Sequence, residues 1–145
     1  SELGEAAKQE YEDQMKTMHE WYLAWLENGI PAEDARFVLP NAAETRMVFT
    51  MNARKLMHFF ALRSCTRAQW EIRALAWAML GMVRRDAPGL FDKNGPSCLG
   101  GACTEGRMSC GRMQDMRARS AEFDAFLASK PDDAAIVEWI ETNVK

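Results

Sequence analysis

The stretch ETRMVFTMNARKLMHFFALRSCTRAQWEIR, residues 44–73, changes its hydrophobic period partway along. From residue 45 to residue 52 the side chains alternate with the period of a β-strand: Thr45, Met47, Phe49 and Met51 on one face, and Arg46, Val48, Thr50 and Asn52 on the other. Asn52 can cap the helix that residues 53–63 are predicted to form. Because one strand cannot satisfy its own edges, we predict a mainly helical α+β fold. Its strand would join an antiparallel sheet completed by missing sequence or by another chain.

The residues before this stretch are predicted to be helical. Residues 5–28 carry an apolar stripe at helical spacing, made of Tyr11, Met15, Met18, Tyr22 and Leu26. Gly29 is placed to end that helix, since glycine accepts the left-handed conformation. Pro31 then opens a short helix that ends near Leu39.

The second half of the chain is predicted to hold three helices around one loop. Thr66 and Gln69 form a capping box for a helix over 67–85, with an apolar stripe of Leu75, Met79 and Val83. Residues 94–111 are rich in glycine and cysteine and predict a loop. Helices over 112–129 and 132–144 follow, the last capped by Asp132 or Asp133.

Composition limits the class of protein. With 145 residues and 48% hydrophobic residues, the chain can build one globular core. It has no apolar run of about 20 residues and its start does not resemble a signal peptide, so we expect a cytoplasmic protein without membrane contact. In that compartment cysteines are thiols or metal ligands more often than disulfides.

Positive charge is concentrated in the middle of the chain. Residues 30–85 hold nine Lys and Arg against four Asp and Glu, although the whole chain has a net charge of -3. Clustered cations repel one another unless an anion offsets them. A basic region confined within an acidic chain favours a small anion in a pocket over nucleic acid.

Five side chains of this region are candidates for an anion site. Arg54 and His58 are four residues apart on one helix face, and Arg63 ends the same helix. Arg67 opens the next helix, and Arg36 lies on the short helix before the strand. Paired guanidinium donors suit a phosphate or a planar anionic ring. The alternative is that these arginines are solvated charges with their stems on apolar neighbours.

Three motifs in this order, EDARFVLP, TRMVFTMNARKLMHFFALR and AQWEIR, closely resemble the C-terminal half of flavin-dependent thymidylate synthases over about residues 15–95. The tail beginning GPSC also looks like one that some of these synthases carry. The resemblance implies a homotetrameric enzyme that methylates dUMP to dTMP. Methylenetetrahydrofolate supplies the carbon in this family, and FAD supplies the hydride that it takes from NADPH.

The resemblance also implies roles for single residues. Arg36 and Arg63 match positions that hold dUMP, and Arg63 is the expected catalytic residue. The matched positions around FAD are Asn52, Arg54, His58 and Arg67. His58 stands where the family has asparagine or histidine, and Arg67 stands where histidine is common. On this basis we divide the chain into a family-like part over 1–93, a loop over 94–111 and a helical extension over 112–145.

One family motif is absent. The signature Arg-His-Arg-x-x-Ser-x-Asn-x-x-Ser-x-Arg, which lies in the N-terminal half of the family, does not occur in this sequence. We expect a fragment of a longer enzyme, and a naturally short relative with a separate N-terminal partner or a degenerate member stay open. The rival functions are a nucleotide- or flavin-binding protein without turnover and a structural domain that oligomerises through the Tyr11–Leu26 stripe.

The cysteines of the loop form a further candidate site. Cys98, Cys103 and Cys110 have the spacing C-x4-C-x6-C, which is looser than paired zinc knuckles and one ligand short. Cys65 or a residue of another chain could supply the fourth ligand. Three interpretations stay open: a metal site, reduced structural thiols, and a disulfide or redox pair.

Overall fold

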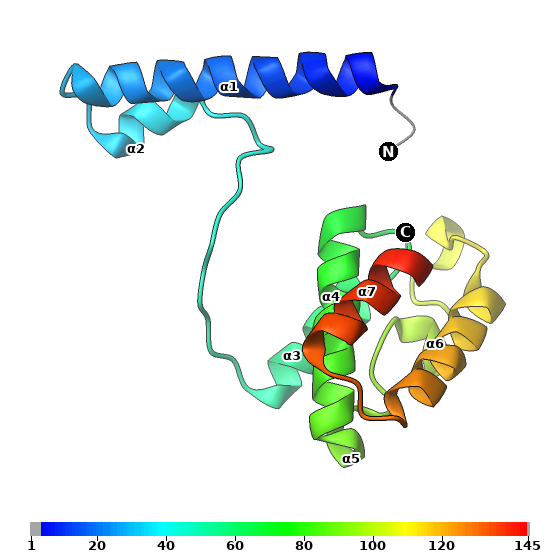
Figure 1. Ribbon diagram of the computed structural model, residues 1–145. Coiled ribbons are helices and arrows are strands. Elements are labelled where there is room, and N and C mark those ends of the chain that lie inside the picture. The colour runs from blue at the N-terminus through cyan, green and yellow to red at the C-terminus, as the bar shows by residue number, and fades with distance from the viewer. Residues whose placement is uncertain (1–3, 145) are drawn as a thin grey trace. The chain divides into compact units, whose positions relative to one another are not determined.

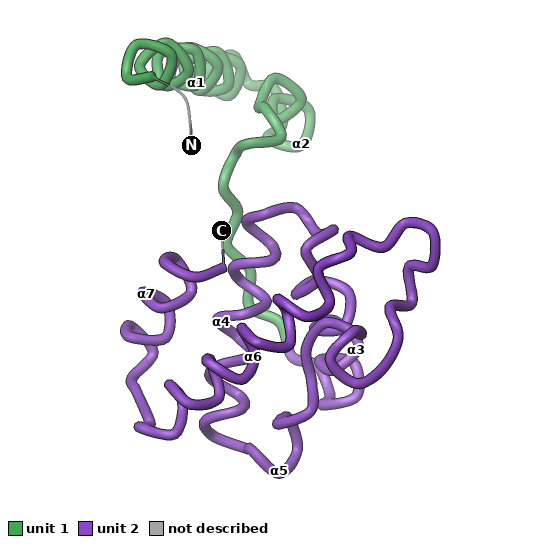
Figure 2. Tube along the Cα trace, turned by 90° about the vertical axis from the view of Figure 1, so that its right-hand side faces the viewer, with its two compact units in different colours: residues 1–49 green, residues 50–145 purple. Residues whose placement is uncertain are grey.

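The computed structural model describes residues 4–144, and every regular element in that range is a helix. The chain divides into two compact units, residues 1–49 and residues 50–145 (Figure 2). Each unit is described by itself below. None of the described helices is both long and apolar enough to cross a membrane.

In the first unit, helix α1 (Glu5–Glu27) packs against the short helix α2 (Ala32–Ala35) and the 3-10 turn η1 (Arg36–Val38) (Figure 1). Gly29 ends α1 as predicted. Its φ is +81°, and its amide donates to the carbonyl of Leu26 at 3.0 Å. A glycine therefore stands where a side chain would be strained.

Helix α1 keeps much of its apolar surface exposed. No residue of this helix is buried. The predicted stripe is half-buried at Met15, Met18, Tyr22 and Leu26 but exposed at Tyr11. Trp21 and Trp25, which lie off the stripe, are 56% and 47% exposed. The first unit alone thus does not cover the apolar side chains of its longest helix.

The predicted strand is wrong. Within residues 4–144 no residue belongs to a strand, and residues 43–52 run without regular structure toward α3 (Ala53–Arg63) (Figure 1). Val48, in the middle of the predicted strand, is fully exposed. Alternation sorts side chains onto two faces, but a strand also needs a neighbour that pairs with its backbone. The described range supplies none, so its fold is helical rather than α+β.

The second unit is organised around helix α4 (Trp70–Asp86). It contacts α3, the one-turn helix α5 (Pro88–Phe91), α6 (Met113–Leu127) and α7 (Asp133–Asn143). Figure 1 shows α6 and α7 beside α4. A single core joins α3, α4, α6 and α7. These helices supply the largest fully buried side chains: Trp77, Phe60, Phe123, Leu80, Met116 and Ile136.

The closest approach in this core is at Gly81. A Cβ at that position would lie 2.5 Å from Cζ of Phe123 and 2.9 Å from Cγ2 of Ile136. Both neighbours are completely buried. The missing side chain of Gly81 therefore lets α6 and α7 pack directly on the α4 backbone.

Two helix starts form as the sequence predicts. The side chain of Asn52 accepts a hydrogen bond from the amide of Lys55 at 3.0 Å and caps α3. Asp132, rather than Asp133, caps α7 by accepting from the amide of Ala135 at 2.8 Å. Each cap satisfies an amide that has no partner inside the helix.

The start of α4 differs from the prediction. Gln69 alone caps it, accepting from the amides of Glu71 and Ile72 at 3.0 and 3.1 Å. The predicted capping box with Thr66 is therefore wrong, and residues 67–69 precede the helix. Gln69 reaches the first free amides from just outside the helix, so nothing requires a cap three residues earlier.

Residues 94–111 form the predicted loop, with two short 3-10 turns, η2 (Ser97–Leu99) and η3 (Gly106–Met108). Arg117 of α6 holds the loop in place. Its Nε donates to the carbonyl of Cys98 and its Nη2 to the carbonyl of Gly101, both at 3.0 Å. The loop is thus fixed to the core by hydrogen bonds from one side chain of α6 to two loop carbonyls.

A buried arginine fixes the beginning of the same loop. Arg84 of α4 is only 4% exposed and donates to Asp124 Oδ1 at 2.6 Å, to Ser120 Oγ at 3.2 Å and to the carbonyl of Asn94. Burial lowers the pKa of the Arg84 guanidinium, and the carboxylate of Asp124 opposes that shift. The ion pair compensates for a charge that the core would otherwise exclude.

Candidate functional site

The arginines separate into those that hold the fold and those that are free to bind a ligand. Arg73 holds the fold, because it donates to the carbonyls of Thr66 and Ala68 at 3.1 and 3.2 Å. Within residues 4–144 no ion pair involves the four arginines predicted for the anion site, which are all exposed: Arg36, Arg54, Arg63 and Arg67. Their guanidinium groups are therefore available to an anion.

Two of these arginines meet His58 at one open groove in the second unit. The groove has a volume of about 480 Å³. His58 and Arg63 reach it from α3, and Arg67 reaches it from the turn between α3 and α4. Leu62, which is 49% exposed, adds an apolar surface between them.

The facing side of the groove comes from the cysteine-bearing loop. Ser97, Thr104 and Glu105 line it there. The hydroxyl of Ser97 lies 3.0 Å from that of Thr104, which fixes the two side chains relative to each other. These three residues had no signal in the sequence, because only the folding of the loop against α3 brings them to the groove.

This arrangement suits an anionic ligand with a planar part. Two guanidinium groups offer paired donors to phosphate or carbonyl oxygens, and an imidazole offers either a donor or an acceptor. The apolar surface of Leu62 can cover a ring, and the carboxylate of Glu105 can accept from a hydroxyl or an amine. The volume is in the range of sites for small molecules and cofactors.

The N-terminus of α4 does not add to this site. Arg67 was predicted to open that helix, but α4 begins at Trp70. The side chain of Gln69 already accepts from two of the first amides, and Glu71 places a carboxylate in the first turn. The attraction of this helix end for an anion is thus already satisfied by the chain itself.

The other predicted residues lie outside the groove. Arg54 is exposed on α3, one turn before His58. Asn52 caps α3 through its carbonyl oxygen, which leaves its amide nitrogen free to donate. Arg36 belongs to the first unit, in η1. The ligand-binding roles of all six residues stay predictions.

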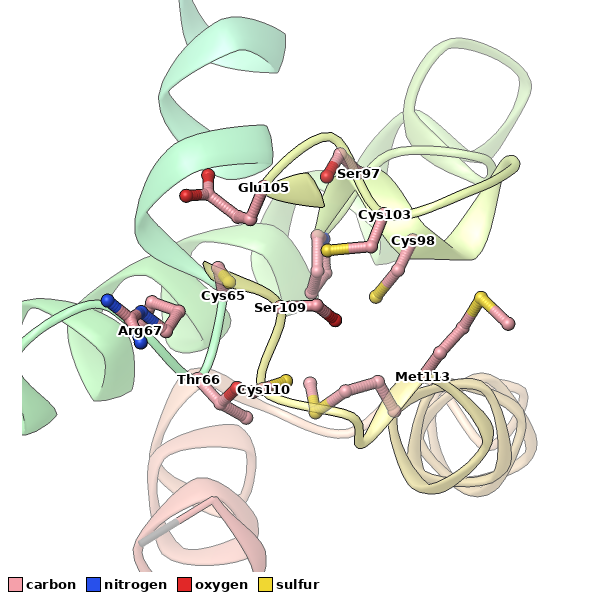
Figure 3. A pocket seen from close by; sticks show the side chains of 12 residues that line it. Cys65, Thr66, Arg67, Ser97, Cys98, Cys103, Glu105, Ser109, Cys110 and Met113 are labelled. Carbon is pink, nitrogen blue, oxygen red and sulfur yellow. The ribbon is translucent and has the colours of Figure 1, made fainter. Parts of the chain in front are cut away.

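The four cysteines line a second, smaller pocket beside the groove. Cys65, Cys98, Cys103 and Cys110 surround a cavity of about 10 Å³ (Figure 3). All four are free thiols. In the described part of the chain, no three His, Cys, Asp or Glu side chains already stand in a metal-binding array.

The thiols of this pocket differ in their ionisation. Burial raises the pKa of Cys98, and the neighbouring thiol of Cys65 adds to this effect. The nearby hydroxyl of Thr66, followed by the backbone amide of Arg112, lowers the pKa of Cys110. Cys98 therefore ionises less readily than an ordinary cysteine, and Cys110 ionises more readily.

Comparison with known proteins gives one family. The family model described as thymidylate synthase complementing protein matches residues 1–89. A protein of Geobacter sulfurreducens named flavin-dependent thymidylate synthase is 54% identical over 113 residues, which are 78% of this chain and 49% of that protein. A protein of the same name from Clostridium tetani is 61% identical over 85 residues, covering 59% of this chain and 34% of the relative.

A third relative of that name, from Thermococcus onnurineus, is 45% identical over 106 residues and covers 68% of this chain and 43% of its own length. The chain thus spans between about a third and a half of the length of these curated relatives. No solved structure matches the chain.

Proposed function

Because the chain belongs to the family of flavin-dependent thymidylate synthases, we propose that it contributes to the reductive methylation of dUMP to dTMP. The observation that carries the proposal is the groove lined by His58, Arg63 and Arg67, where neither arginine forms an ion pair within residues 4–144. These are residues that the family resemblance assigns to substrate and cofactor. The proposal concerns the share of the site that this chain supplies.

We assign Arg63 to the nucleotide, and the family resemblance implies the same role for Arg36 of the first unit. A guanidinium forms two parallel hydrogen bonds with a phosphate or with adjacent carbonyl oxygens, and each charge-assisted bond is stronger than a neutral one. Arg63 is the proposed catalytic residue because it contacts the substrate, holding the uracil ring or phosphate and offsetting negative charge on it. Arg63 is the last residue of helix α3 (Ala53–Arg63).

The residues of the groove also fit the flavin cofactor. Arg67 suits the pyrophosphate of FAD, and His58 suits the polar edge of the isoalloxazine ring. Asn52 and Arg54 would extend this contact along the start of α3, where Asn52 has a free amide donor. When bound, FAD supplies the hydride that comes from NADPH, and methylenetetrahydrofolate supplies the carbon.

The test is a pair of titrations on the full chain. FAD binding is followed by quenching of flavin fluorescence, and dUMP binding by calorimetry. Arg67→Ala should weaken FAD binding, and Arg63→Ala should weaken dUMP binding by about 1.5–3 kcal/mol, the range for a hydrogen bond to a charged group. Arg107→Ala is the matched control, because Arg107 is exposed and does not line the groove.

Two outcomes would contradict the proposal. One is an affinity for both ligands that the groove variants leave unchanged. The other is a loss of affinity that Arg107→Ala reproduces, because the effect would then report net charge rather than the groove. Release of tritium from C5-labelled dUMP, measured with NADPH and methylenetetrahydrofolate present, separates turnover from binding alone.

We propose that the enzyme is a cytoplasmic homo-oligomer, and the family resemblance implies that it is a tetramer. Helix α1 supports association, since it has no buried residue and exposes Trp21 and Trp25. Covering large apolar side chains is the main source of free energy for association.

A further inference from the structure

All four cysteines of the chain line one small pocket, although Cys65 lies more than 30 residues before the other three. Cys65 follows α3, whereas Cys98, Cys103 and Cys110 are distributed along the loop. In Figure 3 their side chains face a common space. The fold therefore brings Cys65 to the three cysteines of the loop, around a cavity of about 10 Å³.

The backbone on both sides of this pocket is held in place. The indole of Trp77, itself completely buried, donates to the carbonyl of Ser64 at 2.9 Å, directly before Cys65. Arg117 holds the carbonyl of Cys98 at 3.0 Å. These two contacts anchor the turn after α3 and the loop to the core, so their cysteines stay opposite each other.

We propose that Cys65, Cys98, Cys103 and Cys110 bind one Zn²⁺ ion, which fastens the loop to the turn after α3. Four thiolates are the ligand set of closed structural zinc sites. The C-x4-C spacing of Cys98 and Cys103 lies within the range of zinc knuckles.

The size of the pocket favours a single ion. A cavity of about 10 Å³ is close to the volume that one water-sized sphere requires. An iron–sulfur cluster, which brings its own sulfides, needs several times more space. Thiolate ligands also select zinc over the hard cations magnesium and calcium.

The thiols surround the cavity without yet converging on one point, since none of the described residues form a ready metal-binding array. A cysteine sulfur moves by roughly 3 Å between staggered rotamers. Zn–S bonds of about 2.3 Å in a tetrahedron need sulfur–sulfur distances of about 3.8 Å. Rotation of cysteine side chains on an anchored backbone is the movement we propose for binding.

Charge and protons balance in this step. The four thiols release four protons to solvent, and Zn²⁺ with four thiolates carries a net charge of two negatives. Arg67 lines the pocket and can offset part of it. The amide of Arg112 already donates to the sulfur of Cys110 at 3.5 Å, as expected for a backbone donor that stabilises a metal-bound thiolate.

The proposed zinc site would also help to maintain the shape of the groove. Cys65, Arg67, Ser97 and Glu105 line both the cysteine pocket and the groove. A metal ion on one side of these residues would hold the loop side of the groove at a fixed distance from α3. The zinc site itself does not depend on which ligand the groove binds.

The test measures the binding of Zn²⁺ to the full chain with its cysteines reduced. We expect one zinc per chain by elemental analysis. Co²⁺ in its place should give sulfur-to-cobalt charge-transfer absorption and the visible bands of a tetrahedral site. Cys103→Ala and Cys110→Ala, which change half-buried thiols, should each weaken Zn²⁺ binding by more than about 100-fold, beyond the effect of losing a residue that only orients a ligand.

Met113→Leu is the matched control, because Met113 lines the same pocket and the change conserves volume and all four thiols. It should retain one zinc. Far-UV circular dichroism identifies variants that fail to fold, and Co²⁺ titration of the unchanged chain does not depend on them. Four reactive thiols with no Co²⁺ spectrum, or a disulfide between any two cysteines in the purified chain, would overturn the proposal.

Discussion

Replacing Gly81 with alanine tests how closely α6 and α7 pack on α4. The new methyl group would lie 2.5 Å from Phe123 and 2.9 Å from Ile136, distances that real Cβ contacts essentially never reach. Both neighbours are fully buried core side chains, so neither can turn away into solvent. Gly81→Ala must therefore move a helix or force side chains out of their rotamers.

The net effect is a difference between two free energies. Alanine in place of glycine inside a helix stabilises by about 1 kcal/mol. Overpacking a core destabilises by about 1–3 kcal/mol, and two contacts below 3.0 Å place this site at the upper end. We expect Gly81→Ala to lower the free energy of unfolding by about 1–2 kcal/mol, measured by urea denaturation with circular dichroism.

Gly89→Ala is the matched control. Gly89 lies in α5, and a Cβ at that position meets nothing within 4 Å. This variant should be as stable as the original chain or slightly more stable. Shortening the neighbour, in Gly81→Ala combined with Phe123→Leu, should recover part of the loss because the two sites couple. Equal stability of Gly81→Ala and Gly89→Ala would show that α6 and α7 do not pack tightly on α4 at Gly81.

Three further outcomes are expected. Arg84→Met should lower the free energy of unfolding by about 2–3 kcal/mol in urea, since it leaves the carbonyl of Asn94 without its donor; an unchanged midpoint would contradict the buried network. Asp132→Ala should cost about 1 kcal/mol through loss of the α7 cap, whereas Asp133→Ala should cost less, and equal losses would show that the cap is misassigned. Light scattering should give a mass well above the 16.4 kDa of one chain, because α1 leaves its tryptophans exposed, and a compact monomer would exclude association.

Helix boundaries were predictable where one side chain fixes them. Asn52 and Asp132 cap α3 and α7, and Gly29 ends α1, each through a local contact within four residues. Such contacts are encoded in a short window of sequence. The start of α4 was missed because Thr66 and Gln69 match the capping-box pattern although Gln69 caps the helix alone.

Features that depend on distant partners were not predictable in the same way. The alternation in residues 44–52 has the period of a strand, but pairing depends on a neighbour that a local pattern does not reveal. The predicted apolar stripe of α4 began at Leu75, which is 51% exposed. The buried face instead contains Trp77, Leu80 and the charged Arg84, whose burial depends on Asp124 of another helix.

The candidate site likewise combines residues that a local sequence pattern identifies with residues that only the fold brings together. His58, Arg63 and Arg67 lie within ten residues, so a helix and a turn bring them together, and both the sequence spacing and the family resemblance point to them. The approach of the loop residues Thr104 and Glu105 depends on tertiary packing. The fourth member of the cysteine cluster, Cys65, was only a candidate until the fold placed it beside the loop.

Binding of the flavin in the groove is tested most directly by a titration of the isotope-labelled chain with FAD, followed by backbone amide NMR. We expect the largest shifts on both sides of the groove, at residues 58–68 and 97–105, and we expect Arg67→Ala to weaken them at equal FAD concentration. Shifts confined to α6 and α7, or none at millimolar FAD, would contradict the claim that this groove receives the flavin.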